Sequence, residues 1–411
     1  MIRILFFIIL ATTLHAKTIT VGHGKIRSIK IAIDMAQSGD TILIQKGIYK
    51  EGNIIIKKSI TLLGVDYPLI DGENKYEIFT IVADHVTLSG LHLVNTGVSS
   101  INDTSAINGL EADDLKIINN KFDNTYFGIH LSNSIGCLIE GNTLASYANT
   151  DVERQTGNGI HLWKCERVQI RKNTITGHRD GIYFEFVTHS KVEENVSYEN
   201  LRYGLHFMFS HDDEYINNTF RNNGSGVAVM YTKGVSMLGN RFEENWGSSS
   251  YGLLLKDISE SKIERNVFYK NTIGVLMEGC SRSDFNNNEF SQNGWALKIQ
   301  ANCDANTFIE NNFTSNTFDV ATNGSISLNT ISKNYWDKYE GYDLNKDGVG
   351  DIPYRPVSLY GMVVEKMPTA VMLWRSFLVT LLDRAEKVIP VVTPENLKDE
   401  LPAMKFITKR L

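Results

Sequence analysis

Short apolar runs alternate with glycine and asparagine along most of this chain. Within the runs the apolar residues follow a period of two, which is typical of β-strands. A glycine followed by an apolar residue recurs in step with the runs, from Gly128 to Gly274. An asparagine followed two residues later by an apolar or small residue recurs mostly every 22 or 23 residues, at Asn120, Asn142, Asn173, Asn195, Asn218, Asn240, Asn266, Asn288, Asn311 and Asn329.

Self-similarity at a fixed interval predicts a stack of repeats. We interpret each repeat as one coil of a right-handed parallel β-helix, an all-β solenoid that covers residues 17–335. Asparagine tolerates left-handed backbone, and its amide can bond an asparagine one coil above or below. We therefore expect Asn195, Asn218 and Asn240 to stack in one column at a corner of the solenoid.

A short amphipathic helix precedes the first coil. Between Ser28 and Gln37, apolar residues stand at i, i+3, i+4 and i+7, and Ser28 is a candidate N-cap. A helix here would cover the open apolar end of the solenoid. The wider gap between Gly128 and Gly159 predicts an inserted loop around residues 146–157.

The first 16 residues have the pattern of a secretory signal peptide. Arg3 precedes an apolar segment over residues 4–10, and Ala16 offers a small residue at the cleavage point. We expect the mature chain to start at Lys17. An uncleaved anchor is the alternative.

Residues 336–361 form an Asp-rich segment, which we expect to be a loop and a cap. Asp343, Asn345, Asp347 and Asp351 stand at positions 1, 3, 5 and 9 of a calcium-loop pattern, with Gly348 at position 6. Position 12 is not the usual glutamate. The segment therefore predicts either a calcium ion or an Asx-turn cap that closes the solenoid.

Residues 362–411 are expected to form a docking helix and a proline-containing tail. Residues 362–389 have a helical pattern, but the apolar part over 370–382 reaches only about 20 Å, too short for a bilayer. Docking on a partner or packing along the solenoid would each cover this helix. Its apolar residues are predicted to lie on one side: Leu373, Trp374, Phe377, Leu378 and Leu381.

The net charge and the cysteine positions limit the possible binding partners and covalent links of the chain. The net charge of -6 gives no basic surface for nucleic acid. The chain has 4 cysteines, of which Cys280 and Cys303 fall at equivalent positions of neighbouring coils. Neighbouring strands lie about 4.8 Å apart, so this pair forms either a disulfide or two stacked buried thiols.

Alternation within the Gly-apolar units predicts which side chains face outward. Phe184 and Phe186 are expected to point inward, as are Phe207 and Phe209. Two outward columns follow, namely His130, His161, Tyr183, His206, Ala228 and Ser132, Trp163, Glu185, Met208, Met230.

Imidazole and thioether groups on one outer sheet are unusual, because methionine has little reason to be exposed unless something binds there. These groups are ligands that favour Cu(I). His161, His206, Met208 and Met230 are therefore candidate copper ligands. A protein-contact patch with adaptable methionines is the alternative.

An enzyme that acts on polysaccharide is the competing functional class. Such β-helix enzymes need paired carboxylates, or a carboxylate beside Lys or Arg, on an outer sheet. The predicted outer face offers Glu185 alone, with Arg179, Asp180 and His189 at coil edges. We therefore interpret the chain as a non-catalytic protein, with a polysaccharide-binding or polysaccharide-modifying protein as the alternative.

The segment after the last coil, from Asn334-Tyr335-Trp336-Asp337 to Tyr354-Arg355-Pro356, together with the asparagine ladder and the apolar helix, resembles the NosD family. The resemblance covers essentially the whole mature chain. It implies a periplasmic β-helix that partners an ABC transporter, composed of the membrane subunit NosY and the ATPase NosF. It further implies a role in supplying copper or sulfur to nitrous oxide reductase, together with the copper chaperone NosL. The family has no catalytic motif to carry over to this chain.

Overall fold

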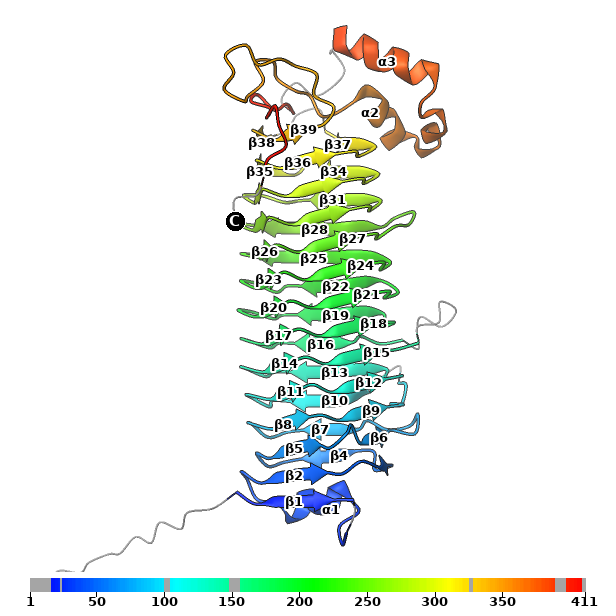
Figure 1. Cartoon of the computed structure of the whole chain (residues 1–411), viewed down its shortest axis with the longest axis vertical. Coiled ribbons are helices and arrows are strands. Elements are labelled where there is room, and N and C mark those ends of the chain that lie inside the picture. Colours follow the sequence, from blue (N-terminus) through cyan, green and yellow to red (C-terminus); the bar gives the residue numbers. More distant parts are fainter. Residues whose placement is uncertain are drawn as a thin grey trace, which may run out of the picture.

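The computed structural model describes residues 16–22, 24–99, 104–147, 156–324, 328–388 and 397–408. It is a right-handed parallel β-helix, a single column of stacked coils, with one short helix at its N-terminal end and a helical cap at the other (Figure 1). The predicted fold class is confirmed. The predicted signal peptide, apart from Ala16, and most of the predicted loop at 146–157 lie outside the described residues.

Three parallel sheets form the walls of the solenoid. Within the described residues the first has 14 strands, which are β1 (Thr18–Val21), β2 (Thr41–Ile44), β5 (Thr61–Gly64), β8 (Thr87–Ser89), β11 (Lys116–Ile118), β14 (Leu138–Glu140), β17 (Gln169–Arg171), β20 (Lys191–Glu193), β23 (Glu214–Ile216), β26 (Ser236–Leu238), β29 (Lys262–Glu264), β32 (Asp284–Asn286), β35 (Asp304–Ile309) and β38 (Leu328–Ser332).

The second sheet is the one that carries the outward His and Met columns. Its 12 strands in the described part of the chain are β4 (Ile54–Ile56), β7 (Phe79–Ile81), β10 (Ser105–Leu110), β13 (Phe127–Ser132), β16 (Ile160–Trp163), β19 (Asp180–Glu185), β22 (Tyr203–Met208), β25 (Ser225–Lys233), β28 (Tyr251–Ser259), β31 (Ile273–Glu278), β34 (Trp295–Ile299) and β37 (Phe318–Thr322).

The third sheet closes each coil. Its 13 described strands are β3 (Ile48–Tyr49), β6 (Leu69–Asp71), β9 (His92–Val94), β12 (Lys121–Asp123), β15 (Thr143–Ala145), β18 (Thr174–Thr176), β21 (Val196–Tyr198), β24 (Thr219–Arg221), β27 (Arg241–Glu243), β30 (Val267–Tyr269), β33 (Glu289–Ser291), β36 (Asn312–Thr314) and β39 (Tyr335–Trp336). Stacked phenylalanines fill the core behind it, as in the Phe268–Phe290 pair, whose ring centroids are 4.7 Å apart.

The asparagine ladder runs up the corner between the 14-stranded and 13-stranded sheets. Asn195 donates its backbone N–H and its side-chain amide to Oδ1 of Asn218, at 2.9 and 3.0 Å, and Asn218 donates in the same way to Asn240. The predicted single column is confirmed. Asn329 was wrongly placed in it, because Asn329 bonds Asn306 in another column, and Asn334 continues the ladder above Asn311.

A second asparagine ladder, which the sequence reading missed, runs up the corner between the 13-stranded and 12-stranded sheets. Each backbone N–H donates to the next amide oxygen at 2.9–3.2 Å, along Asn200, Asn223, Asn245, Asn271, Asn293 and Asn316. One coil below Asn200 the same position holds His178, whose N–H donates to Asn200 Oδ1 at 3.1 Å. Burial lowers the pKa of His178 to about 3.

The N-terminal cap is helix α1, Ile29–Met35. Ser28 is its N-cap and accepts a hydrogen bond from the backbone N–H of Ile31, as predicted. Ile29, Ala32 and Ile33 are buried against the first coils. The helix therefore covers the apolar end of the solenoid.

The C-terminal helical segment is broken, and the prediction of one helix over 362–389 was wrong. It consists of α2 (Leu359–Lys366), the 3-10 helix η2 (Pro368–Leu373) and α3 (Phe377–Val388). Pro368 starts η2, and Arg375 has a φ of 63° between η2 and α3. Within the described residues, none of the helices has both the length and the apolar character needed to cross a membrane.

The tail returns to the last coils and completes the cap. Asp399 is fully buried and accepts hydrogen bonds from the backbone N–H of Asn334 at 2.9 Å and from Trp336 Nε1 at 3.0 Å. Ala403 forms β-bridges with Tyr335 and Val349. The tail, expected to belong with the docking helix, therefore shares the capping role predicted for residues 336–361.

All four cysteines are buried free thiols in this structure. Cys280 and Cys303 stack on neighbouring coils as predicted, and the backbone N–H of Cys280 lies 3.4 Å from Cys303 Sγ. Of the two alternatives, the structure has stacked thiols. Burial raises the pKa of Cys137 to about 12 and that of Cys165 to about 11, so both are poor nucleophiles.

Candidate functional site

The outward columns of the 12-stranded sheet have the predicted register. His161 pairs with Tyr183 and Tyr183 with His206, while Met208 pairs with Met230 on the next strand. Figure 1 shows their strands β16, β19, β22 and β25 as consecutive coils in the middle of the solenoid. This region is the candidate metal face.

The first column is a continuous row of rings that meet at tilted or edge-on angles. Ring centroids lie 4.9 Å apart between His130 and His161, 4.7 Å between His161 and Tyr183, and 5.1 Å between Tyr183 and His206. The Tyr183 hydroxyl donates to the sulfur of Met208 at 3.9 Å, which links the two columns. Burial is the main reason why the pKa of Tyr183 rises to about 12, so the hydroxyl keeps its proton.

His206 lies over a buried carboxylate that sequence reasoning assigned only to a coil edge. Its Nδ1 is 3.8 Å from Oδ2 of Asp180, which is 0 % exposed. Arg179 Nε and Arg202 Nε lie 4.0 and 3.9 Å from the same carboxyl group. The two guanidinium groups balance the charge that burial would otherwise disfavour. The imidazole itself is 6 % exposed.

The sequence placed Asp180 at a coil edge but did not predict its position beside His206, because the strict alternation of β19 is broken after Asp180. Asp180 pairs in register with Tyr203 rather than with a core residue, and Gly181 separates it from the inward Ile182. A sequence feature could have indicated this position: Asp180 immediately precedes Gly181, one of the recurring glycines of the repeat. In this column that residue faces the outer side, next to the imidazoles.

His206, Met208 and Met230 are the predicted ligands that the structure brings together. Met208 and Met230 are half-buried neighbours on β22 and β25, and His206 precedes Met208 by two residues on the same face. Among the residues that the structure describes, neither ring nitrogen of His206 has a hydrogen-bond partner. A buried polar atom without a partner requires an explanation, and a metal ion would supply one.

His161 lies apart from this group. Tyr183 stands between His161 and His206, so the two imidazoles are two coils, or roughly 10 Å, apart. Bonds of about 2 Å from one metal ion to nitrogen cannot span that distance. Burial, with help from the neighbouring His130 and Arg179, lowers the pKa of His161 to about 3, so its ring is neutral near pH 7.

The Asp-rich loop satisfies its own backbone. Asp343 accepts from the N–H groups of Asp347 and Gly348, and Asp351 accepts from that of Leu344. These are the Asx-type contacts of a capping turn, and Asn345 takes part in them through Asp347 N–H. Across the described ranges, no three His, Cys, Asp or Glu side chains are grouped to hold a metal ion. Calcium binding by this loop stays a prediction.

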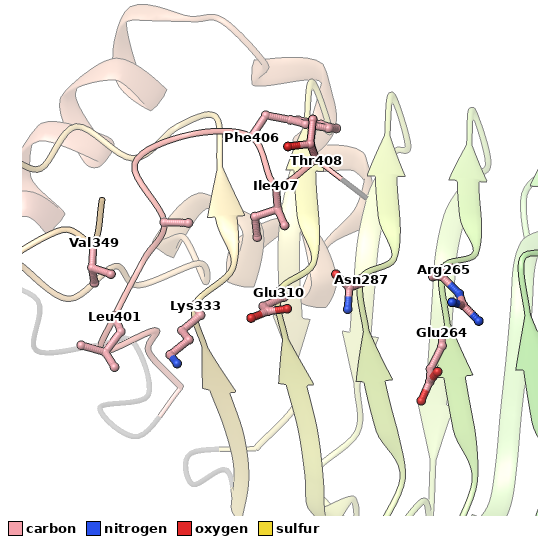
Figure 2. Close-up of a pocket in the computed structure, with 11 residues that line it drawn as sticks. Glu264, Arg265, Asn287, Glu310, Lys333, Val349, Leu401, Phe406, Ile407 and Thr408 are labelled. Atoms are coloured by element: carbon pink, nitrogen blue, oxygen red, sulfur yellow. The ribbon is translucent and has the colours of Figure 1, made fainter. Parts of the chain in front are cut away.

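A pocket of about 560 Å³ lies elsewhere, between the C-terminal tail and the turns of the last coils. Figure 2 shows charged side chains from successive turns, among them Glu310 and Lys333, facing the tail residues Leu401 and Ile407. It has no imidazole, thiol or thioether in its lining. The pocket therefore offers none of the soft ligands that Cu(I) prefers.

Two aromatic residues beside the candidate metal face were wrongly predicted to point inward. Phe186 and Phe209 are 44 % and 37 % exposed, and both have left-handed backbone, with φ of 56° and 50°. A left-handed residue ends the strand alternation, so the side chain turns out of the core. Tyr231, one coil further, is 39 % exposed with φ of 55°.

The helical cap presents a second apolar surface. Trp374 packs on Phe318, with ring centroids 5.4 Å apart, and Val379 is buried in the same cluster. Phe377 is 82 % exposed. All five residues predicted to share one apolar side are at least partly exposed, namely Leu373, Trp374, Phe377, Leu378 and Leu381.

Comparison with known proteins gives consistent results. The family model described as "Periplasmic copper-binding protein (NosD)" matches residues 144–345. The "Probable ABC transporter binding protein NosD" of Stutzerimonas stutzeri is 27 % identical over 380 residues, 88 % of this chain and 86 % of that protein. Its counterpart of the same name in Pseudomonas aeruginosa is 26 % identical over 373 residues, 86 % of each chain.

Among solved structures, the catalytic unit of a GH87 α-1,3-glucanase from Streptomyces thermodiastaticus aligns with a TM-score of 0.60 at 14 % identity, over 78 % of this chain and 69 % of that chain. At that identity the likeness concerns the β-helix fold alone. The two bacterial relatives instead match nearly the whole chain, and the family model covers the coils that carry the candidate metal face. The family model and the two relatives therefore support assignment of the chain to the NosD family.

Proposed function

We propose that this protein is a periplasmic accessory factor for maturation of the copper centres of nitrous oxide reductase. In this role it works with an ABC transporter, NosY and NosF, receives copper from the chaperone NosL and hands it on to the reductase. The description of its family as periplasmic and copper-binding supports the cargo and the compartment. The names of the two relatives support a transporter partner.

The observation that carries the proposal is the grouping of His206, Met208 and Met230. One imidazole and two thioethers form a soft ligand set that suits Cu(I) and suits hard divalent ions poorly. The two methionines are half-buried rather than enclosed. A partner can therefore reach the ion, as transfer of a cargo requires.

Asp180 would position the histidine ligand. Metal-binding imidazoles usually donate their second ring N–H to a carboxylate or carbonyl, which fixes the ring. Asp180 Oδ2 lies 3.8 Å from Nδ1 of His206, so the ring would have to move closer to form this bond, and Nε2 would then be left to bind the ion. Because Asp180 is buried between Arg179 and Arg202, it can serve this role without itself reaching the cargo.

The same burial disfavours the polysaccharide enzyme. A pair of accessible carboxylates is required to move a proton to and from a sugar. On the central coils Glu185 is half-buried and faces outward, whereas Asp180 is wholly enclosed. The described outer face around the histidines therefore has one usable carboxylate.

Membrane association would come through the helical cap. The exposed side chains of η2 and α3, such as Met372 and Phe377, form an apolar surface at the end of the solenoid. Monomeric soluble proteins seldom leave such a surface uncovered. We infer that the membrane subunit of the transporter covers it.

Cu(I) titration of the mature chain under reducing conditions, against a chromogenic chelator, tests the copper assignment. The wild type should bind one Cu(I), and Met208→Ala combined with Met230→Ala should lose most of that affinity. Met35→Ala combined with Met372→Ala is the control, since it removes two exposed thioethers from other parts of the molecule. Undiminished Cu(I) affinity in the Met208/Met230 variant would contradict the assignment.

A further inference from the structure

Three aromatic rings form an exposed ladder along the edge of the candidate metal face. Phe186, Phe209 and Tyr231, here called the aromatic stack, occupy one position on three consecutive coils. Ring centroids lie 5.2 Å apart for Phe186–Phe209 and 5.0 Å apart for Phe209–Tyr231, with interplanar angles of 11° and 13°. All three rings are substantially exposed.

The backbone conformation at these three positions is energetically unfavourable for aromatic residues. Each of the three residues has a positive φ, a conformation that suits Gly, Asn and Asp and is a genuine outlier for bulky residues. Equivalent turns on other coils carry Asn133, Lys164, Asp257 and Gly279 instead. Strained and exposed aromatic residues that recur on three neighbouring coils indicate a surface kept for binding.

The aromatic stack borders the proposed copper ligands directly. Phe209 follows Met208 in the chain, and Tyr231 follows Met230. A molecule that exchanges a ligand with either sulfur would therefore approach next to these rings. Aromatic residues are also enriched at the centres of protein interfaces.

The orientation of the rings selects the kind of partner. Because the rings stack on one another, the ring faces between them are covered, and the exposed part of the central ring, Phe209, is its edge. A sugar would need an open ring face, whereas the electropositive edges suit aromatic side chains and backbone carbonyls of a protein. Three partly exposed rings are a small contact area, which fits a short-lived complex.

We propose that the aromatic stack is the docking surface for a Cu(I)-carrying protein, which exchanges its ion with the sulfurs of Met208 and Met230. Docking beside the ligands would hold the two copper sites close enough for ligand exchange. The exchange step rests on the function proposed above. The docking step rests on the ring geometry and the backbone conformation.

Asparagine substitutions test the docking step without threatening the fold, because asparagine tolerates a positive φ. The stack variant is Phe186→Asn, Phe209→Asn and Tyr231→Asn together. The matched control is Tyr67→Asn, since Tyr67 is also exposed and has a φ of 54° on a distant coil. Circular dichroism and thermal melting should show that both variants stay folded.

Binding of Cu(I)-loaded NosL from the same organism is then measured by calorimetry, and Cu(I) affinity separately by chelator competition. We expect the stack variant to bind NosL at least about tenfold more weakly, with an unchanged Cu(I) affinity, while Tyr67→Asn behaves like the wild type. Equal NosL affinity in the wild type and the stack variant would overturn the inference, as would an equal loss in the Tyr67 control.

Two further outcomes separate this inference from the proposed function. If the wild type binds NosL through the stack but takes up no Cu(I), the copper assignment fails and the docking surface stands. If instead a mixture of alginate and α-glucan oligosaccharides binds the wild type and not the stack variant, while NosL affinity is the same for both, the surface serves a saccharide and the inference is refuted.

Discussion

Replacing Asp399 by alanine should destabilise the last coils of the solenoid strongly. The carboxylate accepts from Lys333 N–H at 3.0 Å, from the N–H and Nδ2 of Asn334 at 2.9 and 3.1 Å, and from Trp336 Nε1 at 3.0 Å. It is therefore the terminal acceptor of the asparagine ladder, supplied from 65 residues further along the chain.

The expected loss in the free energy of unfolding follows from the hydrogen-bond donors that alanine would leave unpaired. Both donors of Asn334 and the indole N–H of Trp336 are buried, and each unpaired buried group costs about 1–3 kcal/mol. The three donors share one acceptor oxygen, so their costs do not add in full and the low part of the range applies. We expect a loss of about 3–5 kcal/mol for Asp399→Ala, and about 1–2 kcal/mol for Asp399→Asn, which keeps one acceptor oxygen.

Urea unfolding followed by tryptophan fluorescence would measure this loss, because Trp336 stacks on Phe313 with ring centroids 4.1 Å apart. Glu400→Ala is the control, since Glu400 is exposed and pairs with Lys398 at the surface. Stability of Asp399→Ala within about 1 kcal/mol of that control would refute the capping role. Deleting residues 362–411 would remove this cap together with the helices, so point substitutions are the better test of docking.

The remaining predictions concern the two ladders and the helical cap. Asn218→Leu should lower the free energy of unfolding by about 1–3 kcal/mol, because both neighbouring rungs lose partners, and urea unfolding that matches the wild type would contradict this. His178 has a folded-state pKa of about 3, so the unfolded chain binds the extra proton, and stability should fall as the pH drops from about 6.5 towards 3, by about 1.4 kcal/mol per unit from this group. His178→Asn should remove that contribution, seen as a smaller melting-temperature drop between pH 7 and pH 4.5, and an unchanged drop would exclude His178 as its source. Phe377→Asp combined with Leu381→Asp should leave a folded protein that no longer co-purifies with NosY and NosF, and retention of the complex would place docking on the solenoid.

The repeat itself could be predicted from the sequence because its determinants are local. A coil of 22 or 23 residues places each asparagine above the previous one, so the spacing alone identifies the ladder that joins Asn195 to Asn218. The same holds for helix α1, where the apolar spacing and the Ser28 cap lie within one short segment. The outward register of His206, Met208 and Met230 also follows from simple alternation.

Alternation along a strand no longer predicts whether a side chain points inward or outward where the backbone leaves the extended conformation. The left-handed residues Phe186 and Phe209 turn outward although their parity with Phe184 predicts the core. Asp180 likewise faces the imidazoles because Gly181 interrupts the strand pattern. Phe186 and Phe209 belong to the aromatic stack, and Asp180 is the carboxylate beside His206. The sequence therefore predicted only part of the candidate site.

Contacts between distant segments carry no periodic signal at all. Nothing near Asp399 in the sequence indicates that its carboxylate completes a ladder ending at Asn334, since the pairing depends on where the tail returns in space. The sequence by itself therefore determined the coil, its ladder and the face that carries the soft ligands, because spacing within a repeat sets all three. The tertiary structure alone decided how the solenoid ends, which carboxylate supports His206 and which aromatic rings reach solvent, because each depends on backbone torsions or on partners brought together only by folding.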